Sequence, residues 1–285
     1  MSSSAVSTLG IAGSGIMAAG IAEVGILAGC DVVVRARTHR GSDELMAQVT
    51  KSLGRRVERG KLDAGARDTA LSRLTCTTSL DALAGCDLVI ESVVEDKEAK
   101  IALLRDLDRV LSPESVLATN TSTLSVSELA LSTSHPDRVC GIHFFNPATT
   151  MPLVEIVRPL TASQSTIDTA VAFVAACGKD AVLVRDDAGF VVNALLFPYL
   201  NNAIKLMERG TASINDIDTA MKGGCNFPMG PFALLDLVGL DTSLSILETL
   251  AAASGNPADR PAETLVRLVS EGHLGRKTGR GFHTY

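Results

Sequence analysis

The stretch Thr8-Leu9-Gly10-Ile11-Ala12-Gly13-Ser14-Gly15-Ile16-Met17-Ala18 decides the fold of this 285-residue chain. Its first five residues form a short apolar run, which is typical of a buried parallel strand. The remainder matches the pattern G-x-G-x-x-G/A, and residues 19–29 continue as a helix. In this arrangement Gly13 permits a tight turn, Gly15 lets a diphosphate approach the backbone, and the helix start presents free N–H groups. We therefore predict a dinucleotide site at Gly13, Gly15, Ile16 and Met17.

The end of the second predicted strand, residues 31–35, indicates which dinucleotide binds. An acidic residue there usually holds the 2′-hydroxyl of the adenosine ribose. This chain has Arg35-Ala36-Arg37-Thr38 instead, with no acid before Asp43. An arginine attracts a 2′-phosphate through charge-assisted hydrogen bonds. Arg35, Arg37 and Thr38 therefore favour NADP(H), with NAD(H) still possible; the alternative is a solvated basic loop.

Strands and helices alternate along the first two thirds of the chain. This alternation predicts an α/β fold with a doubly wound parallel sheet. Beyond residue 185 only helical patterns follow, so we predict a dinucleotide-binding domain over residues 1–185 and an all-α domain over residues 186–285. The further strands are expected at residues 87–91, 115–119, 138–143, 153–157 and 181–185, and the helices at 42–60, 97–111, 166–177, 190–209, 241–253 and 261–271.

Composition excludes several classes of protein. Lys and Arg total 26 against 32 Asp and Glu, and this net charge of −6 argues against nucleic-acid binding through bulk charge. The apolar run from residue 9 to 30 contains Glu23 and precedes the first basic residue, Arg35, which argues against export or a membrane anchor. Neither the histidines nor the six cysteines have metal-ligand spacing. We expect six buried, reduced thiols, no metal and a cytoplasmic protein.

Three polar residues lie in or just after predicted strands and could carry chemistry. Ser122 lies in Asn120-Thr121-Ser122, just after one strand, and His143 ends another. Glu155 lies inside the apolar run 153–157, where a buried carboxylate needs a partner. A histidine base in turn needs a carboxylate to orient it. A His143–Glu155 pair satisfies both needs, although a lone histidine near an apolar run is more often a core residue.

The chain resembles the 3-hydroxyacyl-CoA dehydrogenases, especially the short, single-function 3-hydroxybutyryl-CoA dehydrogenases. The resemblance extends from about residue 9 to the last residue. It rests on ordered blocks of sequence at residues 13–17, 93–96, 120–122, 143–147, 189–193, 228–231, 239–241 and 274–282.

The resemblance implies a Rossmann-type domain, a helical dimerisation domain and specific residue roles. His143 is then the catalytic base paired with Glu155, Ser122 and Asn193 contact the reacting oxygens of the substrate, and Asn146 supports His143. Glu95, Lys100 and Asn120 match cofactor-side positions, and Arg59 matches a basic position that meets CoA.

The expected reaction is hydride transfer between a nicotinamide and a 3-hydroxyacyl or 3-ketoacyl thioester, by a homodimer. The alternatives are a thioester bound to a carrier protein, a hydroxy acid without CoA, and a non-catalytic dinucleotide-binding protein such as the lens proteins related to this family.

Overall fold

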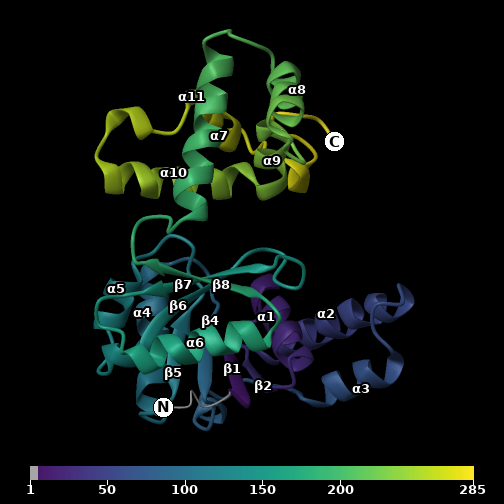
Figure 1. Cartoon of the computed structure of the whole chain (residues 1–285), viewed down its shortest axis with the longest axis vertical. Helices are drawn as coiled ribbons and strands as arrows, with labels where there is room; N and C mark the ends of the chain where they lie inside the picture. The colour runs from purple at the N-terminus through teal and green to yellow at the C-terminus, as the bar shows by residue number, and fades with distance from the viewer. Residues whose placement is uncertain (1–5) are drawn as a thin grey trace. The chain divides into compact units, whose positions relative to one another are not determined.

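The computed structural model describes residues 6–285. The chain forms two compact units, one ending at Asp187 and the other spanning Ala188–Tyr285. The first unit contains a sheet with helices on both faces, and the second contains helices (Figure 1).

The sheet of the first unit has eight strands in the order β3-β2-β1-β4-β5-β6-β7-β8. From β1 the chain continues outward through β2 to β3 and then crosses to β4 on the other side of β1. The direction of winding therefore reverses at β1, the strand that precedes the glycine-rich turn. In open α/β sheets such a switch point is where ligands bind. The strands are β1 (Thr8–Ala12), β2 (Asp31–Arg35), β3 (Leu74–Thr77), β4 (Leu88–Glu91), β5 (Val116–Thr119), β6 (Val139–Phe144), β7 (Leu153–Arg158) and β8 (Asp180–Arg185).

Alternate residues of each strand face opposite layers of helices, because side chains along a strand alternate with a period of two. Leu88 and Ile90 of β4 pack into the core under α1 and α6, whereas Val89 packs into the core under α4 and α5. The helices of this unit are α1 (Ile16–Leu27), α2 (His39–Glu58), α3 (Ala64–Ser72), α4 (Lys97–Val110), α5 (Val126–Leu131) and α6 (Gln164–Ala176), as Figure 1 shows.

The prediction of an α/β sheet with a following helical domain is confirmed, but the last two strands, β7 and β8, run opposite to the other six. β7 runs antiparallel to β6, and β8 is parallel to β7. Only eight residues, 145–152, separate β6 from β7. A parallel connection needs about a dozen or more residues, so this short loop forces an antiparallel return.

Local capping explains another difference from the sequence prediction. The second helix begins at His39 rather than near Ser42, because the Thr38 hydroxyl accepts a hydrogen bond from the Gly41 N–H and caps it. Helix α3 and strand β3 follow it and were not predicted. The short segment Leu74–Thr77 has too little alternation to stand out in the sequence.

The second unit is helical and has its own apolar core. Phe232, Leu235 and Leu265 are fully buried in it. Asp218 accepts hydrogen bonds from Phe232 and Ala233 at the start of α9. Its helices are α7 (Val192–Glu208), α8 (Ile214–Cys225), α9 (Pro231–Val238), α10 (Leu240–Ser254) and α11 (Glu263–Ser270).

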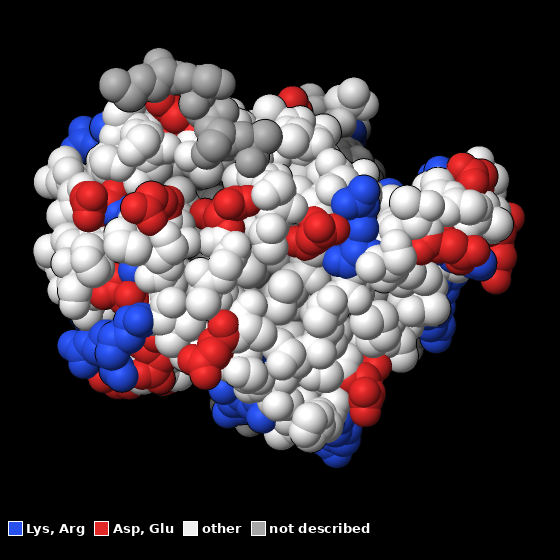
Figure 2. Space-filling view, turned by 90° about the horizontal axis from the view of Figure 1, so that it is seen from below, with Lys and Arg blue, Asp and Glu red and all other residues white. Residues whose placement is uncertain are grey.

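Two further observations concern the charges on one face of the molecule and the length and polarity of its helices. On the face seen in Figure 2, acidic and basic side chains are interspersed, as is typical of a solvated surface. Within residues 6–285, none of the helices is both long and apolar enough to cross a bilayer.

The expectation of six buried thiols is wrong for Cys225, which is exposed at the end of α8, while Cys76 and Cys177 are partly buried. Cys140 is fully buried in the sheet, and burial raises the pKa of its thiol to about 12. Because the thiolate is the nucleophile, we expect iodoacetamide to label native Cys225 first and Cys140 only after unfolding. Peptide mass spectrometry checks the order, with Cys225→Ser as the control that loses the fast label. Equal labelling rates at both cysteines would contradict this arrangement.

Candidate active site

His143 and Glu155 lie directly opposite each other on neighbouring strands. They form a registered pair of the antiparallel strands β6 and β7. The His143 Nδ1 lies 2.9 Å from the Glu155 Oε2, and the two residues are 4% and 1% exposed. The antiparallel return of β7 therefore produces the contact, because opposite residues in such a pair project side chains to the same face.

Ser122 completes a chain of three polar side chains. It lies in the loop after β5, and its Oγ is 3.1 Å from the His143 Nε2. If Nδ1 donates its hydrogen to the Glu155 carboxylate, Nε2 is the acceptor nitrogen and faces Ser122. An imidazole held in this way can accept a proton from an alcohol at Nε2 while the carboxylate stabilises the resulting charge.

The loop that carries Ser122 is fastened by Glu95. One Glu95 oxygen accepts hydrogen bonds from the backbone N–H groups of Ser122 and Thr123 and from the Thr121 and Thr123 hydroxyls. Burial alone would raise the pKa of Glu95, but the Lys100 charge and these hydrogen bonds outweigh it and hold the pKa below its ordinary value. An ionised Glu95 therefore positions the Ser122 loop at neutral pH.

Lys100 is buried beneath this loop, with only 1% of the residue exposed. Its ammonium binds both oxygens of Glu91, at 2.8 and 3.0 Å, and lies 3.3 Å from Glu95. The Thr119 hydroxyl also donates to Glu91. Glu91, Glu95 and Lys100 thus form one network across the carboxyl ends of β4 and β5.

Two further contacts hold segments next to Ser122 and His143. The Asn120 side-chain oxygen accepts a hydrogen bond from the backbone N–H of Phe144, which follows His143. The Asp186 carboxylate accepts hydrogen bonds from Ser125, Val126 and Ser127 at the start of α5. The sequence does not point to Asp186, Glu91 or Thr119, because partners distant in sequence leave no local pattern.

The glycine-rich turn fits a diphosphate group. Gly13 has φ +144°, and a Cβ there would lie 2.1 Å from the Ser92 carbonyl oxygen, so only glycine fits. At Gly15 an added Cβ would meet no described atom within 4 Å, so the backbone is open to a ligand. Among the described residues, no side chain caps the start of α1. The N–H groups that begin at Ile16 and Met17 are therefore suited to an anion.

The residues expected to select the cofactor surround the end of β2. The Arg35 carbonyl accepts the Gly13 N–H, and Ala36 is fully buried. Arg37 and Thr38 are exposed at the start of α2, whose first turn contains no acidic residue. The Thr38 oxygen accepts the capping hydrogen bond from Gly41, so its hydroxyl hydrogen can still be donated to a ligand.

The remaining predicted site residues, Asn146, Arg59 and Asn193, belong to three other elements of the chain. Asn146 is exposed in the loop after β6, three residues beyond His143. Arg59 is exposed at the C-terminal end of α2. Asn193 belongs to the second unit, where it is 7% exposed near the start of α7, and its distance from His143 stays a prediction.

A glycine-rich turn at the switch point of a mostly parallel sheet, with a buried His–Glu pair on β6 and β7 of the same sheet, defines a Rossmann-type dehydrogenase. The family models for the 3-hydroxyacyl-CoA dehydrogenase NAD binding domain and C-terminal domain match residues 8–187 and 189–285. The chain therefore belongs to the 3-hydroxyacyl-CoA dehydrogenase family.

Individual relatives are similar to this chain along nearly its whole length. The 3-hydroxybutyryl-CoA dehydrogenase of Mycobacterium tuberculosis is 43% identical over 285 residues, covering 99% of this chain and 100% of that protein. The human mitochondrial hydroxyacyl-coenzyme A dehydrogenase is 41% identical, covering 96% of this chain and 90% of that protein. The crystal structure of (S)-3-hydroxybutyryl-CoA dehydrogenase from Ralstonia eutropha superposes with a TM-score of 0.96 at 39% identity and covers 99% of both chains.

Proposed function

We propose that this chain interconverts 3-hydroxyacyl-CoA and 3-ketoacyl-CoA with a nicotinamide cofactor. The observation that carries the proposal is the His143 ring held between the Glu155 carboxylate and the Ser122 hydroxyl. Membership of the 3-hydroxyacyl-CoA dehydrogenase family supports the same reaction.

In this proposal the side chains handle the proton and the position of the substrate. During oxidation the His143 Nε2 accepts the proton of the 3-hydroxyl group, and Glu155 stabilises the imidazolium. Ser122 and Asn193 hydrogen-bond the oxygen atoms of the substrate and hold C3 in place, which is a positioning effect. Asn146 supports His143 from the following loop.

The cofactor fits the open turn described above. Gly13, Gly15, Ile16 and Met17 would hold its diphosphate, and Glu95, Lys100 and Asn120 would act on the nicotinamide side. The nicotinamide supplies the acceptor or donor of the hydride at C3. Glu95 also accepts a hydrogen bond from the Ser122 backbone N–H, and Asn120 accepts one from the N–H of the residue after His143. Cofactor binding at these two residues would therefore affect the positions of Ser122 and His143.

We further propose that NADP(H) is preferred over NAD(H). Arg37 and Thr38 stand at the N-terminal end of α2, where a helix favours an anion, and Arg35 adds a second guanidinium on the preceding strand. The buried Ala36 leaves this place without the carboxylate that would repel a 2′-phosphate.

Introducing a carboxylate at position 36 tests this preference. We expect Ala36→Asp to lower the ratio of kcat/KM for NADPH to that for NADH by about 10- to 100-fold, which corresponds to about 1.5–3 kcal/mol for one charged hydrogen bond gained or lost. Arg37→Ala is the matched variant, since it removes attraction without adding repulsion and should lower the same ratio. Steady-state kinetics with both cofactors measure it. A wild-type preference for NADH, left unchanged by both variants, would refute the NADP(H) assignment.

An assay with two thioesters tests the proposed function itself. NADPH and NADH are each tested against acetoacetyl-CoA and against the same acyl group on an acyl-carrier protein, followed by absorbance at the cofactor band. Turnover with acetoacetyl-CoA supports the proposal, and competition by free CoA excludes a hydroxy-acid dehydrogenase that does not recognise CoA. Binding of cofactor without turnover would leave only the non-catalytic alternative.

The proposal has three further parts, which concern CoA binding, dimerisation and location in the cell. Arg59 is proposed to meet the CoA part of the substrate, because it offers an exposed cation at the end of α2. The helical unit is proposed to form a homodimer, and the protein is proposed to act in the cytoplasm. Size-exclusion chromatography with light scattering tests the dimer.

A further inference from the structure

The Asp186 carboxylate binds the start of α5, and the proposed function gives it no role. Its Oδ2 accepts hydrogen bonds from the Ser125 hydroxyl at 2.9 Å and from the Ser127 N–H at 2.7 Å, and its Oδ1 accepts one from the Val126 N–H at 3.0 Å. Asp186 lies far along the chain from these three residues. The contacts therefore join two separate parts of the fold.

Asp186 belongs to a segment whose position is fixed by the sheet. It directly follows β8, whose last residue, Arg185, is registered with Arg158 of β7. Glu155 of β7 is registered with Val182 of β8 in the same ladder. The position of Asp186 is therefore tied, through the pairing of β7 with β8, to the strand that carries Glu155.

Ser122 lies on the loop that ends at Ser125, where Asp186 binds. Glu95 holds the first part of this loop, because it accepts hydrogen bonds from the backbone N–H groups of Ser122 and Thr123. Asp186 holds the other end, three residues beyond Ser122. A side chain keeps a precise position when the surrounding hydrogen bonds fix its backbone, and this loop is fixed at both ends.

The packing of Val126 places the start of α5 beside the His–Glu pair. The Asp186 carboxylate holds the backbone N–H of Val126. A Cβ added to Gly141 of β6 would lie 3.1 Å from the Val126 Cγ2 and 2.7 Å from the Val157 Cβ of β7. Gly141 and Val157 each stand two positions from a member of the His–Glu pair, so they face the same side of the sheet. Asp186 therefore holds α5 against the face that carries the pair.

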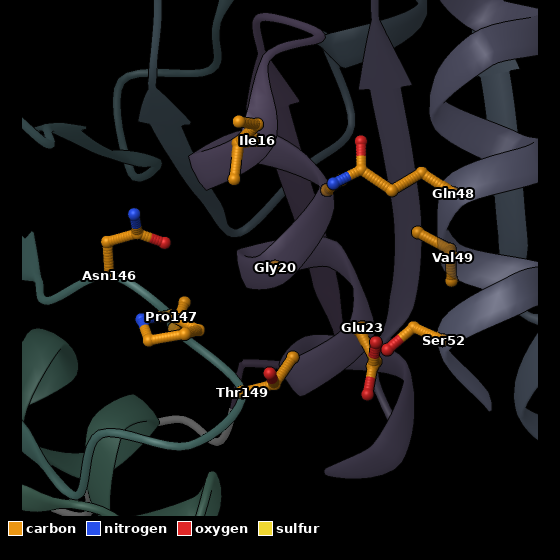
Figure 3. A pocket seen from close by; sticks show the side chains of 11 residues that line it. Ile16, Gly20, Glu23, Gln48, Val49, Ser52, Asn146, Pro147 and Thr149 are labelled. Carbon is orange, nitrogen blue, oxygen red and sulfur yellow. The ribbon is translucent and has the colours of Figure 1, made fainter. Parts of the chain in front are cut away.

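The loop that follows β6 is held by a different contact, its packing against α1. A Cβ added to Gly20 of α1 would lie 3.0 Å from the Ala148 Cβ, so the helix and the loop touch there. Asn146 and Pro147 of the same loop line, together with α1 and α2, a cavity of about 90 Å³ (Figure 3). The histidine on β6 should therefore keep its place in variants of Asp186.

Resting on the proposed function, we infer that Asp186 is a positioning residue for Ser122. It acts through the start of α5 and keeps the Ser122 Oγ at its distance of 3.1 Å from the His143 Nε2. Ser122 is proposed to bind the reacting oxygen of the substrate, so its place sets the distance from that oxygen to the His143 ring. Support of this kind affects the rate, because precise placement of the reacting groups lowers the barrier.

The variant Asp186→Ala tests this inference, because it removes all three hydrogen bonds to α5. We expect it to lower kcat for acetoacetyl-CoA by about 5- to 50-fold, below the roughly 10²-fold that a displacement of about 1 Å can cost, because Glu95 still holds the first part of the loop. The dissociation constant of NADPH should stay unchanged, since the glycine-rich turn lies between β1 and α1.

Asp87→Ala is the matched control. The Asp87 carboxylate also accepts three hydrogen bonds, one from the Ser7 hydroxyl and two from the N–H groups of Ser7 and Thr8. These contacts lie at the amino end of β1, whereas the proposed site lies at the carboxyl ends of the parallel strands. This variant should therefore leave kcat unchanged.

A double-mutant cycle with Ser122→Ala separates positioning from a general loss of stability. If Asp186 acts through Ser122, Asp186→Ala should lower kcat by less than about twofold in the Ser122→Ala background. A purely structural role would give the same loss in both backgrounds. The turnover is expressed per NADPH-binding site, so unfolded protein does not enter the comparison. Asp186→Asn keeps an acceptor oxygen and should restore part of kcat, and it replaces Asp186→Ala in the cycle if that variant does not fold.

The outcomes separate this inference from the proposed function. Unchanged kcat of the Asp186 variant, an equal loss in both backgrounds, or an equal loss for Asp87→Ala would each overturn the inference. Absence of wild-type turnover of acetoacetyl-CoA with either cofactor would instead overturn the proposed function.

Discussion

His143→Ala should lower kcat by about 10²–10⁴-fold, the range that a positioned general acid–base contributes. The variant removes the imidazole ring whose two nitrogens connect the Ser122 hydroxyl with the Glu155 carboxylate. Steady-state reduction of acetoacetyl-CoA measures the loss. The dissociation constant of the cofactor should not change, since the proposed diphosphate site at Gly13 and Gly15 lies in the turn between β1 and α1.

A double-mutant comparison gives this prediction a sharper form. Glu155 is 1% exposed and acts through the ring, so Glu155→Gln should lower kcat less than His143→Ala does. If His143 is the base and Glu155 acts through it, as proposed, combining His143→Ala with Glu155→Gln should add little to the loss caused by His143→Ala alone. Additive losses, or near-normal turnover of His143→Ala, would show that His143 is a satisfied core histidine and no base.

The sequence predicted the strands that carry the site better than it predicted how those strands run relative to one another. Two strands, Thr8–Ala12 and Asp31–Arg35, match the prediction residue for residue. The pairing of His143 with Glu155 followed from the needs of a buried carboxylate and a histidine base. What makes them neighbours is the antiparallel register of β6 and β7, which an apolar run does not reveal. The eight-residue loop between the strands was the signal, since it is too short for a parallel crossover.

The sequence could not reveal contacts that depend on the whole fold. Glu91 and Lys100 are nine residues apart, one at the end of β4 and the other on α4, and no helical or strand period relates them. Asp186 reaches Ser125 across 61 positions. Glu23 stood out only as a charge inside an apolar run. The structure shows that this charge lies against Ser52 and Arg56 beside a cavity.

Lys100→Met should lower the free energy of unfolding by about 3–5 kcal/mol, the cost typical of breaking a buried ion pair from one side. Methionine replaces the stem of the lysine but leaves Glu91, which is fully buried, with its charge uncompensated. Thr119 and the Val93 N–H still donate to Glu91, but neither supplies a positive charge. Urea denaturation followed by circular dichroism measures the change in the first unit's transition.

The double variant Glu91→Gln with Lys100→Met separates charge from packing. It removes the orphaned charge while keeping both shapes, so it should recover at least half of the stability that Lys100→Met loses. The exposed pair Arg40–Glu44 provides the matched control, since Arg40→Met should change stability by less than about 1 kcal/mol. A loss below about 1 kcal/mol for Lys100→Met would mean that the network contributes little to the fold. Glu95 and the Ser122 loop would then keep their place through their own hydrogen bonds.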